Sequence, residues 1–402
     1  MKIAVVTDYY RPGNSRVQEQ HVRHLAKLGH EVHLLGGTEE PQTARERYEF
    51  AENTHYHPFQ YRPTQSKWKQ FNTLGRELRS RWNQLSSRVQ PDFVIFNQPL
   101  SAFIVQQSST RNLPSLYVHH APWHEEWLAH NPPPQQVLLN VLNLPGRFLN
   151  TWVRYLVEWW VLGHCDRVVV LSQFMRQKLR TNHPGISRNH IQVIPGGVDA
   201  NRFHPPEHRS DAREHTRFEE NDTVILSVRR LVPRMGLDRL IKSFGRLLEN
   251  TRNSNRLQLC IVGKGPEKPR LQTLAENVAP GQVYFEGYVS EEQLPYYYQS
   301  ADLFVMPTQE LEGFGLVILE ALSSGVPVLA TDVGGIPEIL KPLDPNLLLS
   351  ADSSQWHETI ETTLETKCRN PDDSHRCRQY AVNQFSWESG VDKILNIARG
   401  ML

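Results

Sequence analysis

The stretch TQELEGFGLVILEALSSGVPV, residues 308–328, decides the fold. A short apolar run, Leu303–Pro307, precedes it and predicts a buried strand. After a loop with two glycines, the apolar segment Leu316–Ser324 predicts a helix that Gly325 ends. A second apolar strand, Val326–Thr331, then follows. Strand, helix and strand in this order are typical of a parallel sheet covered by helices.

The same strand-and-helix pattern recurs along the whole 402-residue chain. Near-continuous apolar strands that alternate with helices indicate parallel sheets buried on both faces, so we expect the α/β fold class. A chain of this length accommodates two domains of about 200 residues. The further predicted strands are Ile3–Thr7, Glu31–Leu35, Phe93–Asn97, Ser115–His119, Arg167–Ser172, Gln192–Ile194, Thr223–Val228, Gln258–Val262, Val283–Glu286 and Leu347–Ser350.

A polar segment, Asp199–Asp222, separates two series of strands. It has no sustained apolar period and therefore predicts a linker. We expect an acceptor-binding domain at residues 1–205, a nucleotide-sugar-binding domain at 206–385, and a last helix within 386–402 that packs back toward the first domain. Two doubly wound sheets would face each other across a cleft, and ligands bind at the carboxyl edges of such sheets.

The composition is that of an ordinary soluble globular protein, with 39% hydrophobic and 22% charged residues. The net charge of +1 hides an asymmetry, because residues 1–200 hold 22 Lys and Arg against 15 Asp and Glu, and the rest of the chain holds 22 against 28. This difference favours an anionic partner for the first half, and ordinary variation between domains is the alternative. We expect no nucleic-acid partner.

The sequence predicts neither a targeting segment nor a membrane span. The first apolar run is too short for a signal peptide and ends at Asp8, and no run reaches roughly 18 apolar residues. The four cysteines form no CxxC pair and have no histidines at zinc spacing beside them. We therefore expect a cytoplasmic protein with inert thiols, no metal and no cofactor.

Two glutamates in the deciding stretch are candidate ligand contacts. Glu320 lies in a helix that is apolar nearly all round, and a carboxylate buried there needs a partner. That partner is a ligand or a backbone end, and a structural Glu that caps a neighbouring loop is the alternative. Glu312 lies in the loop before the helix, where free amides near Gly315 and Leu316 would face a phosphate.

Three further loops carry glycines or cations directly after predicted strands. Guanidinium groups in the first of them suit a diphosphate, and a solvated basic loop is the alternative. The second and third are weak signals alone, and the lack of a GxGxxG motif disfavours a dinucleotide oxidoreductase. The loops are Val228–Gly236 with Arg229, Arg230 and Arg234, Val262–Pro266 with Gly263 and Lys264, and Asp332–Glu338 with a glycine pair.

The first domain offers a second group of candidates. Gly13 follows the first strand, and a glycine there would let a ligand approach the backbone closely. His119, His120 and His124 lie at or just after the end of the strand Ser115–His119, near the predicted cleft. A single histidine is usually structural, so the structural and the functional interpretation both stay open for these three.

These segments together resemble the retaining glycosyltransferases of family 4, which have the GT-B fold of two Rossmann-like domains. Glu312 and Glu320 match the E-x7-E pair of that family, and the resemblance covers essentially the whole chain. It implies transfer of a sugar, with retention, from a nucleotide-diphosphate donor to a hydroxyl group. A UDP-sugar is the favoured donor and GDP-mannose the second choice. The acceptor would be a lipid, a glycan or a small molecule.

The resemblance also implies a role for each matching residue. Glu312 would contact the sugar hydroxyls, Glu320 the ribose and Arg230 the diphosphate. His120 would contact the sugar and completes the catalytic set with Glu312 and Arg230. Further donor contacts implied by the resemblance are Gly13, Arg234, Gly263, Lys264, Tyr288, Val289, Gly313, Phe314, Gly315 and Leu316, with Tyr288 and Val289 bordering the base.

One position departs from the family pattern. Met235 stands where relatives carry a lysine that grips phosphate, so either Arg234 takes over this role or Arg230 acts alone. Retaining enzymes of this fold lack an evident enzymatic nucleophile, and Glu312 would therefore orient ligands rather than act as a base. No DxD motif occurs, so the resemblance implies no metal at the diphosphate.

The first half also contains a basic amphipathic segment, Arg62–Arg88, with Glu77 as its one acid. It predicts a helix that either rests on an anionic membrane surface or packs its apolar stripe on the sheet, and we favour packing. The segment Pro132–Trp160 could shape a pocket for a lipid acceptor, but we expect its tryptophans in the core. The residues concerned are basic Lys67, Lys69, Arg76, Arg79, Arg81 and Arg88, apolar Trp68, Phe71, Leu74, Leu78, Trp82 and Leu85, and Trp152, Trp159 and Trp160.

Two other functions stay open at this point. Another GT-B enzyme, such as a sugar-nucleotide epimerase or a phosphorylase, would share the fold, although the E-x7-E pair argues against both. A sugar-nucleotide-binding protein without catalytic activity is the second alternative, and Met235 motivates it.

Overall fold

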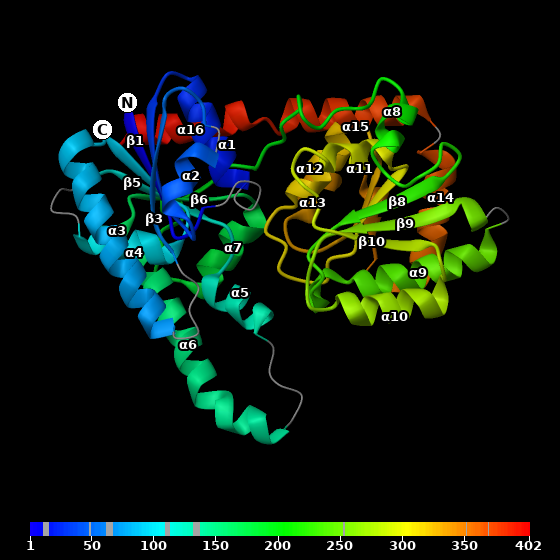
Figure 1. Cartoon of the computed structure of the whole chain (residues 1–402), viewed down its shortest axis with the longest axis horizontal. Coiled ribbons are helices and arrows are strands. Elements are labelled where there is room, and N and C mark those ends of the chain that lie inside the picture. The colour runs from blue at the N-terminus through cyan, green and yellow to red at the C-terminus, as the bar shows by residue number, and fades with distance from the viewer. Residues whose placement is uncertain are drawn as a thin grey trace. The chain divides into compact units, whose positions relative to one another are not determined.

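The computed structural model describes residues 1–10, 16–47, 50–61, 67–108, 113–131, 137–251, 254–350, 352–368 and 370–402. The chain forms two compact units (Figure 1). The first unit combines Met1–Pro195 with Trp387–Leu402, and the second is Gly196–Ser386. Each unit is a parallel sheet with helices on its faces, so the predicted α/β class with two Rossmann-like domains of the GT-B type is confirmed. That the two sheets face each other across a cleft stays a prediction.

The first unit is built on a seven-stranded sheet with the order β3-β2-β1-β4-β5-β6-β7. Its chain direction along the sheet reverses between β1 and β4, where doubly wound sheets bind ligands. The strands are β1 Lys2–Thr7, β2 Glu31–Thr38, β3 Thr54–Gln60, β4 Phe93–Phe96, β5 Ser115–His119, β6 Arg167–Val170 and β7 Ile191–Val193. The helices are α1 Arg16–Lys27, α2 Pro41–Arg47, α3 Lys67–Val89, α4 Pro99–Ser108, α5 Trp123–His130, α6 Val137–His164, α7 Gln173–Asn182 and α16 Trp387–Arg399.

The second unit repeats this plan with a six-stranded sheet of the order β10-β9-β8-β11-β12-β13. Its reversal point lies between β8 and β11, so the loops after these strands are the expected ligand edge. The strands are β8 Thr223–Val228, β9 Leu257–Val262, β10 Val283–Gly287, β11 Leu303–Met306, β12 Val328–Thr331 and β13 Leu348–Leu349. The helices are α8 Arg209–Glu214, α9 Leu237–Asn250, α10 Lys268–Val278, α11 Leu294–Ser300, α12 Leu316–Ser323, α13 Ile336–Leu340, α14 Trp356–Thr366 and α15 Pro371–Gln384.

One strand escapes the sequence pattern. β3 has the sequence THYHPFQ, and its two histidines and its proline hide the apolar alternation that marks a strand. It pairs only with β2 at the end of the sheet, and an edge strand tolerates a proline because one row of its backbone groups is unpaired.

The boundary between the units lies before residue 196, earlier than the boundary at 205 that the linker suggests. The reason is that residues 196–205 pack within the second unit. A side chain at Gly196 would collide with Leu316, and the Ser323 hydroxyl donates to the carbonyl oxygen of Phe203. Helix α16 packs against α1 of the first unit.

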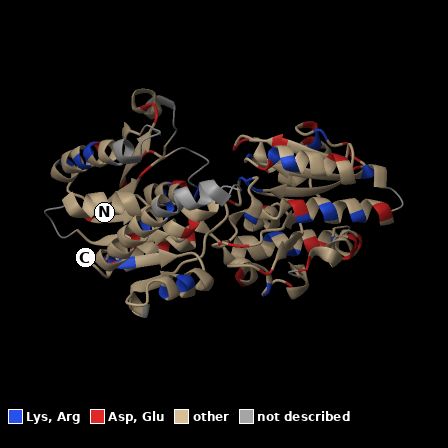
Figure 2. Cartoon of the chain, turned by 90° about the horizontal axis from the view of Figure 1, so that it is seen from below, with Lys and Arg blue, Asp and Glu red and all other residues tan. Residues whose placement is uncertain are grey.

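The apolar stripe of α3 is buried. Leu74, Leu78, Trp82 and Leu85 belong to the core of the first unit, which supports the packing interpretation of this helix for its described side chains. The side chains of residues 67–71 lie outside the described set. Figure 2 shows Lys and Arg together with Asp and Glu on both units. No helix in the described part of the chain combines the length and the hydropathy of a membrane span.

Candidate functional site

Loops after β8, β9, β11 and β12 pack against one another at the carboxyl edge of the second sheet. A Cβ atom at Gly263 would lie 1.9 Å from the carbonyl oxygen of Arg229, and one at Gly236 would lie 2.0 Å from that of Pro307. The amide of Gly335 also donates to the carbonyl oxygen of Glu312 at 3.0 Å. These glycines let the backbones touch, so the loops brace one another and form one platform.

Glu312 is held on this platform by Arg229. The Nη2 group of Arg229 donates to Oε2 of Glu312 and, at 2.6 Å, to the hydroxyl of Thr308. The two charged side chains are only 8% and 14% exposed, so their attraction is poorly screened by water. In the part of the chain that the structure describes, Oε1 of Glu312 has no hydrogen-bond partner. One carboxylate oxygen is therefore fixed, and the other is left for a ligand.

Sequence reasoning did not find this ion pair. It grouped Arg229 with Arg230 as a phosphate contact, whereas the structure directs Arg229 into the protein and leaves Arg230 exposed. The tandem pair of arginines was the available signal, because two adjacent side chains at a strand end point to opposite sides.

Glu320 lies on α12 and is buried, as expected, and it has a partner there. The hydroxyl of Tyr298 on α11 donates to Oε2 of Glu320 at 2.8 Å. This bond gives the carboxylate a partner within the protein, although the partner is a side-chain hydroxyl on a helix and not the backbone end or the loop that the sequence suggested. The ribose contact implied by the family stays a prediction.

The amino end of α12 has no side-chain cap. Gly315 occupies the N-cap position with a φ of 107°, a conformation that strongly favours glycine. The N-cap residue supplies no side-chain hydrogen bond to the first turn of the helix. The amides of Leu316 and Val317 therefore sit at the positive end of the helix, which is a site for an anion.

The cations of this edge fall into two groups. Arg234 donates to the carbonyl oxygen of Leu311 at 3.1 Å and thereby braces the loop. Met235 is only 5% exposed and packs into the core, so it does not meet an anion. Arg230 and Lys264 are exposed, and the Nζ atom of Lys264 lies 5.3 Å from the ring centre of Tyr288. Arg230 and Lys264 are thus better placed than Arg234 to meet a phosphate.

The remaining predicted donor contacts lie on the same unit. The glycine at 313 is half-buried, and the side chain of Phe314 is buried next to the uncapped end of α12. Tyr288 and Val289 follow β10, and the Tyr288 side chain is exposed. The structure therefore brings the loops of the predicted donor set together on one sheet, with one exception. Gly13 lies outside the described residues.

The three histidines at the carboxyl end of β5 differ in their contacts: His119 and His124 contact a buried glutamate, and His120 does not. The Nε2 atom of His119 lies 3.2 Å from Oε1 of Glu158, and Nδ1 of His124 lies 3.5 Å from Oε2. Glu158 also accepts a hydrogen bond from the amide of Trp123 at 3.1 Å. Burial alone would raise the pKa of Glu158, but the hydrogen bonds of the surrounding histidines more than offset it, and the pKa lies well below its ordinary value. Glu158 therefore holds the start of α5, and His119 and His124 in turn contact Glu158.

His120 is half-buried and makes no contact with Glu158 among the described interactions. Burial, with a contribution from His119, lowers the pKa of His120 to about 4. The ring is therefore neutral near pH 7 and offers both a donor and an acceptor. Glu158 was missed from the sequence, because it lies far along α6 in an otherwise apolar helix.

Two polar residues stand at the reversal point of the first sheet, between β1 and β4. Asp8 accepts a hydrogen bond from the amide of Ser101 at 2.6 Å, and burial raises its pKa to about 6 although the Ser101 bonds act in the opposite direction. Asn97 is only 2% exposed, yet neither its Oδ1 nor its Nδ2 atom has a hydrogen-bond partner in the described part of the chain. An unsatisfied buried amide is costly, and a ligand at this edge would supply the missing bonds.

Two family models match nearly the whole chain. The model described as Glycosyltransferase Family 4 matches residues 13–202, and the model described as Glycosyl transferases group 1 matches residues 208–384. The chain belongs to glycosyltransferase family 4. Its division between the two models, at 202 to 208, lies close to the start of the second unit at residue 196.

Two curated relatives match part of this family 4 chain. The chain is 30% identical over 243 residues to a GDP-mannose-dependent monoacylated alpha-(1-6)-phosphatidylinositol monomannoside mannosyltransferase of Corynebacterium glutamicum, covering 58% of this chain and 61% of the relative. It is 31% identical over 245 residues to a GDP-mannose-dependent alpha-(1-6)-phosphatidylinositol monomannoside mannosyltransferase of Mycobacterium tuberculosis, covering 58% and 62%. The matches thus span about three fifths of these relatives.

The fold of this family 4 chain matches that of sucrose-phosphate synthase from Thermosynechococcus elongatus. The TM-score is 0.79 at 21% identity, and the match covers 100% of this chain and 99% of that chain. At this identity the likeness shows the fold alone. Both units of the family 4 chain therefore have known structural counterparts.

Proposed function

We propose that this protein is a retaining glycosyltransferase that moves a sugar from a nucleotide-diphosphate donor to a hydroxyl acceptor. One observation carries the proposal: the braced platform of the second unit presents a fixed Glu312 carboxylate beside the uncapped start of α12. The carboxylate of Glu312 can accept a hydrogen bond from a sugar hydroxyl, and free backbone amides and cations can bind a diphosphate. Arg230 and Lys264 supply the exposed cations of the same edge.

The donor of first choice is GDP-mannose. The resemblance alone favours a UDP-sugar, but the two mannosyltransferases above carry GDP-mannose in their names. A thermal-shift panel of GDP, UDP, ADP and their sugars tests this choice, because a ligand that binds only the folded state raises the melting temperature. A shift with GDP-mannose and none with UDP-sugars supports it, and the reverse pattern moves the choice to a UDP-sugar.

The proposed reaction needs no metal and no protein nucleophile. In our scheme, α12 and Arg230 stabilise the charge that develops on the leaving diphosphate, and Glu312 orients the sugar. His120, neutral near pH 7, would accept or donate a hydrogen bond at a sugar hydroxyl. The proton of the acceptor hydroxyl passes to the leaving phosphate oxygen on the same face. NMR of the product tests retention, since an inverted anomeric centre rules this scheme out.

The acceptor side of the proposal commits to a hydroxyl that is presented at an anionic lipid surface. Helix α6 exposes six apolar side chains, each 46–66% exposed, along one face. Contiguous exposed apolar patches mark surfaces that meet a membrane or a partner. Contrary to expectation, two of its tryptophans are therefore not in the core, because they lie on the side of α6 that faces away from the sheet. The six residues are Phe148, Leu149, Trp152, Val153, Leu156 and Trp159.

The exposed positive charge of helix α3 supports the choice of an anionic lipid surface. Helix α4 packs against both α3 and α6 (Figure 1). The exposed side chains of α3 include Arg76, Arg79, Arg81 and Arg88. Exposed basic and apolar groups together favour binding to anionic lipids. The lipid acceptors named for the two mannosyltransferases agree with this choice.

Sedimentation with vesicles tests the lipid surface. We expect the full chain to bind vesicles that contain phosphatidylglycerol and not vesicles of phosphatidylcholine alone. The double variant Trp152→Ser, Trp159→Ser should bind about tenfold more weakly, because burial of aromatic side chains drives interfacial binding. The matched control is Leu28→Ser, Leu402→Ser, which removes two exposed apolar side chains elsewhere on the first unit. Equal loss in both variants would contradict a role for α6.

A second candidate is a sugar-nucleotide-binding protein without activity, which Met235 continues to favour. Met235 cannot make the phosphate contact that the resemblance assigns to a lysine at this position, and its side chain is buried. Slow hydrolysis of the donor by the wild type, lost in Glu312→Gln, would exclude this candidate. Donor binding with no turnover in any acceptor assay would favour it.

A further inference from the structure

One face of the two outermost strands of the first sheet carries four polar side chains. Glu31 and His33 lie on β2, and His55 and His57 lie on β3. His33 is paired with His55 in the register of the two strands. Because alternate residues of a strand face the same side, all four side chains share one face of the sheet.

These side chains form a compact cluster. The Nε2 atom of His33 lies 2.9 Å from Oε1 of Glu31, and its Nδ1 atom lies 3.0 Å from Nε2 of His57. One ligand atom each from Glu31, His33 and His55 lie within 4.8 Å of one another. In the described residues, this is the one group of at least three His, Cys, Asp or Glu side chains with such spacing.

We propose that Glu31, His33 and His55 bind one divalent transition-metal ion of the zinc type. Two imidazoles and a carboxylate are a donor set that zinc prefers, with a fourth position left for water. Donor atoms around a tetrahedral zinc ion lie roughly 3.4 Å apart, given bond lengths of about 2.0–2.1 Å. His33 is buried and fixed, whereas His55 is exposed and Glu31 is half-buried, so these two can close on the ion without disturbing the core.

His57 completes the site as an outer partner. When His33 binds the metal through Nε2, its proton moves to Nδ1, and Nδ1 then donates to Nε2 of His57 over the 3.0 Å that the structure shows. Metal-bound histidines almost always donate their second ring N–H to an acceptor, usually a carboxylate, a backbone carbonyl or water, and here the neutral ring of His57 would take that place. The cluster therefore has both the ligands and the supporting bond of a metal site.

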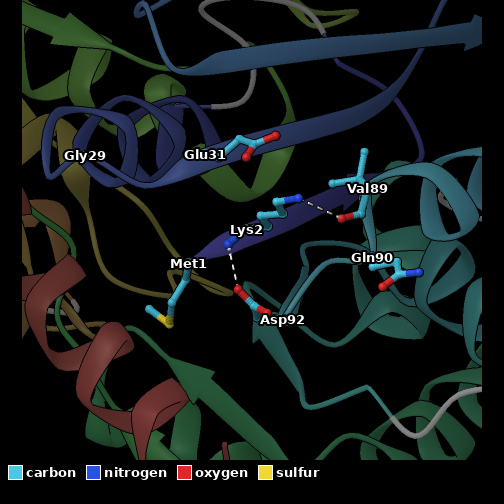
Figure 3. A pocket seen from close by; sticks show the side chains of 7 residues that line it. All are labelled: Met1, Lys2, Gly29, Glu31, Val89, Gln90 and Asp92. Atoms are coloured by element: carbon cyan, nitrogen blue, oxygen red, sulfur yellow. Dashed lines mark hydrogen bonds between the residues drawn. The ribbon is translucent and has the colours of Figure 1, made fainter.

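The site is open to solvent and its surroundings tolerate a cation. Glu31 lines a surface pocket with Lys2, Val89, Gln90 and Asp92 (Figure 3). Helix α3 ends there, and the negative end of its dipole favours a cation. The ammonium of Lys2 is a competing positive charge, but it donates to the carbonyl oxygen of Val89 at 3.3 Å, and the carboxylate of Asp92 adds negative charge.

The position of the cluster argues for a stabilising role. Glu31, His33 and His55 lie near the amino ends of β2 and β3, whereas His120 and Asn97 lie at the carboxyl edge of the sheet. A metal ion here would clip the edge strand β3 to β2 far from the proposed chemistry. The inference does not rest on the proposed glycosyl transfer, and removal of the metal should leave transfer activity unchanged.

The test uses the untagged full chain after treatment with EDTA and dialysis. We expect equilibrium dialysis to show one Zn²⁺ per chain and Co²⁺ to give the visible absorption of a four-coordinate site. Zinc at about 100 times its Kd should raise the melting temperature by roughly 5 °C. Glu31→Gln and His55→Gln, both outside the core, should each weaken zinc binding about 100-fold, and His57→Gln about tenfold.

A matched control separates this site from adventitious binding. His375→Gln removes an exposed histidine from α15 of the second unit and should leave zinc affinity unchanged. Absence of stoichiometric zinc in the wild type would overturn the proposal. Wild-type affinity in both Glu31→Gln and His55→Gln would overturn it as well, even if zinc bound elsewhere.

Discussion

The carboxyl edges of the two sheets differ in how their polar groups are satisfied. At the second sheet, Glu312 is held by Arg229 and Glu320 by Tyr298. At the first sheet, the Asn97 amide is buried without a partner, and Nδ1 of His119 also lacks one in the described residues. A carboxylate held by a protein partner is oriented before a ligand binds, whereas a buried amide without a partner gains its missing bonds when a ligand binds. In the proposed function, the second sheet is then a rigid donor side, and the first sheet is an acceptor side that its substrate completes.

The largest expected effect is at the fixed carboxylate of the rigid side. Glu312→Gln should lower kcat/KM about 1,000-fold, because an oriented polar contact that acts in the transition state is worth this much. Steady-state kinetics with the preferred donor measures it. The control is Glu310→Gln, an exposed acid in the same loop. An equal loss in both variants would mean that the loop, not the Glu312 carboxylate, matters.

The next effect tests whether Arg229 makes the edge rigid. Arg229→Met should lower kcat/KM about 100-fold, because Glu312 loses its anchor. It should also lower the free energy of unfolding by about 3 kcal/mol, since it strands a mostly buried carboxylate. Urea denaturation of both single variants and of the double variant Arg229→Met, Glu312→Gln measures the coupling. If the losses of the single variants simply add, the two side chains do not act as a pair.

The opposite edge should respond with opposite signs in stability and in substrate binding. Asn97→Leu removes an unsatisfied buried amide, so the free energy of unfolding should rise by about 1 kcal/mol. The KM for the acceptor should rise about tenfold while the Kd for the donor stays constant. Denaturation and bisubstrate kinetics measure the two effects, and Asn83→Leu, an exposed position on α3, is the control. A raised Kd for the donor would show that Asn97 affects donor binding, which would contradict this prediction.

The last effect concerns pH and the first unit. Folded His120 and His21 have pKa values lowered to about 4 and about 3, mainly by burial, whereas unfolded histidine titrates near 6.5. The unfolded chain therefore binds more protons as pH falls below about 6.5, and stability decreases. Asp8, whose folded pKa is raised to about 6, acts oppositely and offsets part of the loss.

Urea denaturation at pH 7.5 and pH 5 checks this sign. The wild type should be less stable at pH 5, and His21→Gln should show a smaller difference between the two pH values. Greater stability of the wild type at pH 5 would show that Asp8, not the histidines, dominates the pH dependence.

The two edges also differ in how far the sequence predicts them. The strands, the loop-to-helix start at Gly315 and the burial of Glu320 follow from apolar periodicity and glycine placement, which are local properties. The Arg229–Glu312 pair joins residues from two different loops, and no local pattern encodes it. The same holds for Glu158, whose partners His119 and His124 come from another part of the chain.

The sequence also did not predict which tryptophans are exposed or that β3 is a strand at the edge of the sheet. Trp152 and Trp159 have the spacing of core residues, and only the packing of α6 shows that they face outward. β3 was missed because its histidines replace apolar residues at an edge where one partner strand suffices. The same histidines make the candidate metal cluster, which becomes visible only when the register pairs His33 with His55.

Hydrogen–deuterium exchange of the full chain, with and without the preferred donor, tests the central claim most directly. The account predicts that the donor slows exchange of the amides of Leu316 and Val317 by at least about tenfold, because they would bind the diphosphate at the uncapped start of α12. Saturating donor that protects other segments and leaves these two amides unchanged would contradict it.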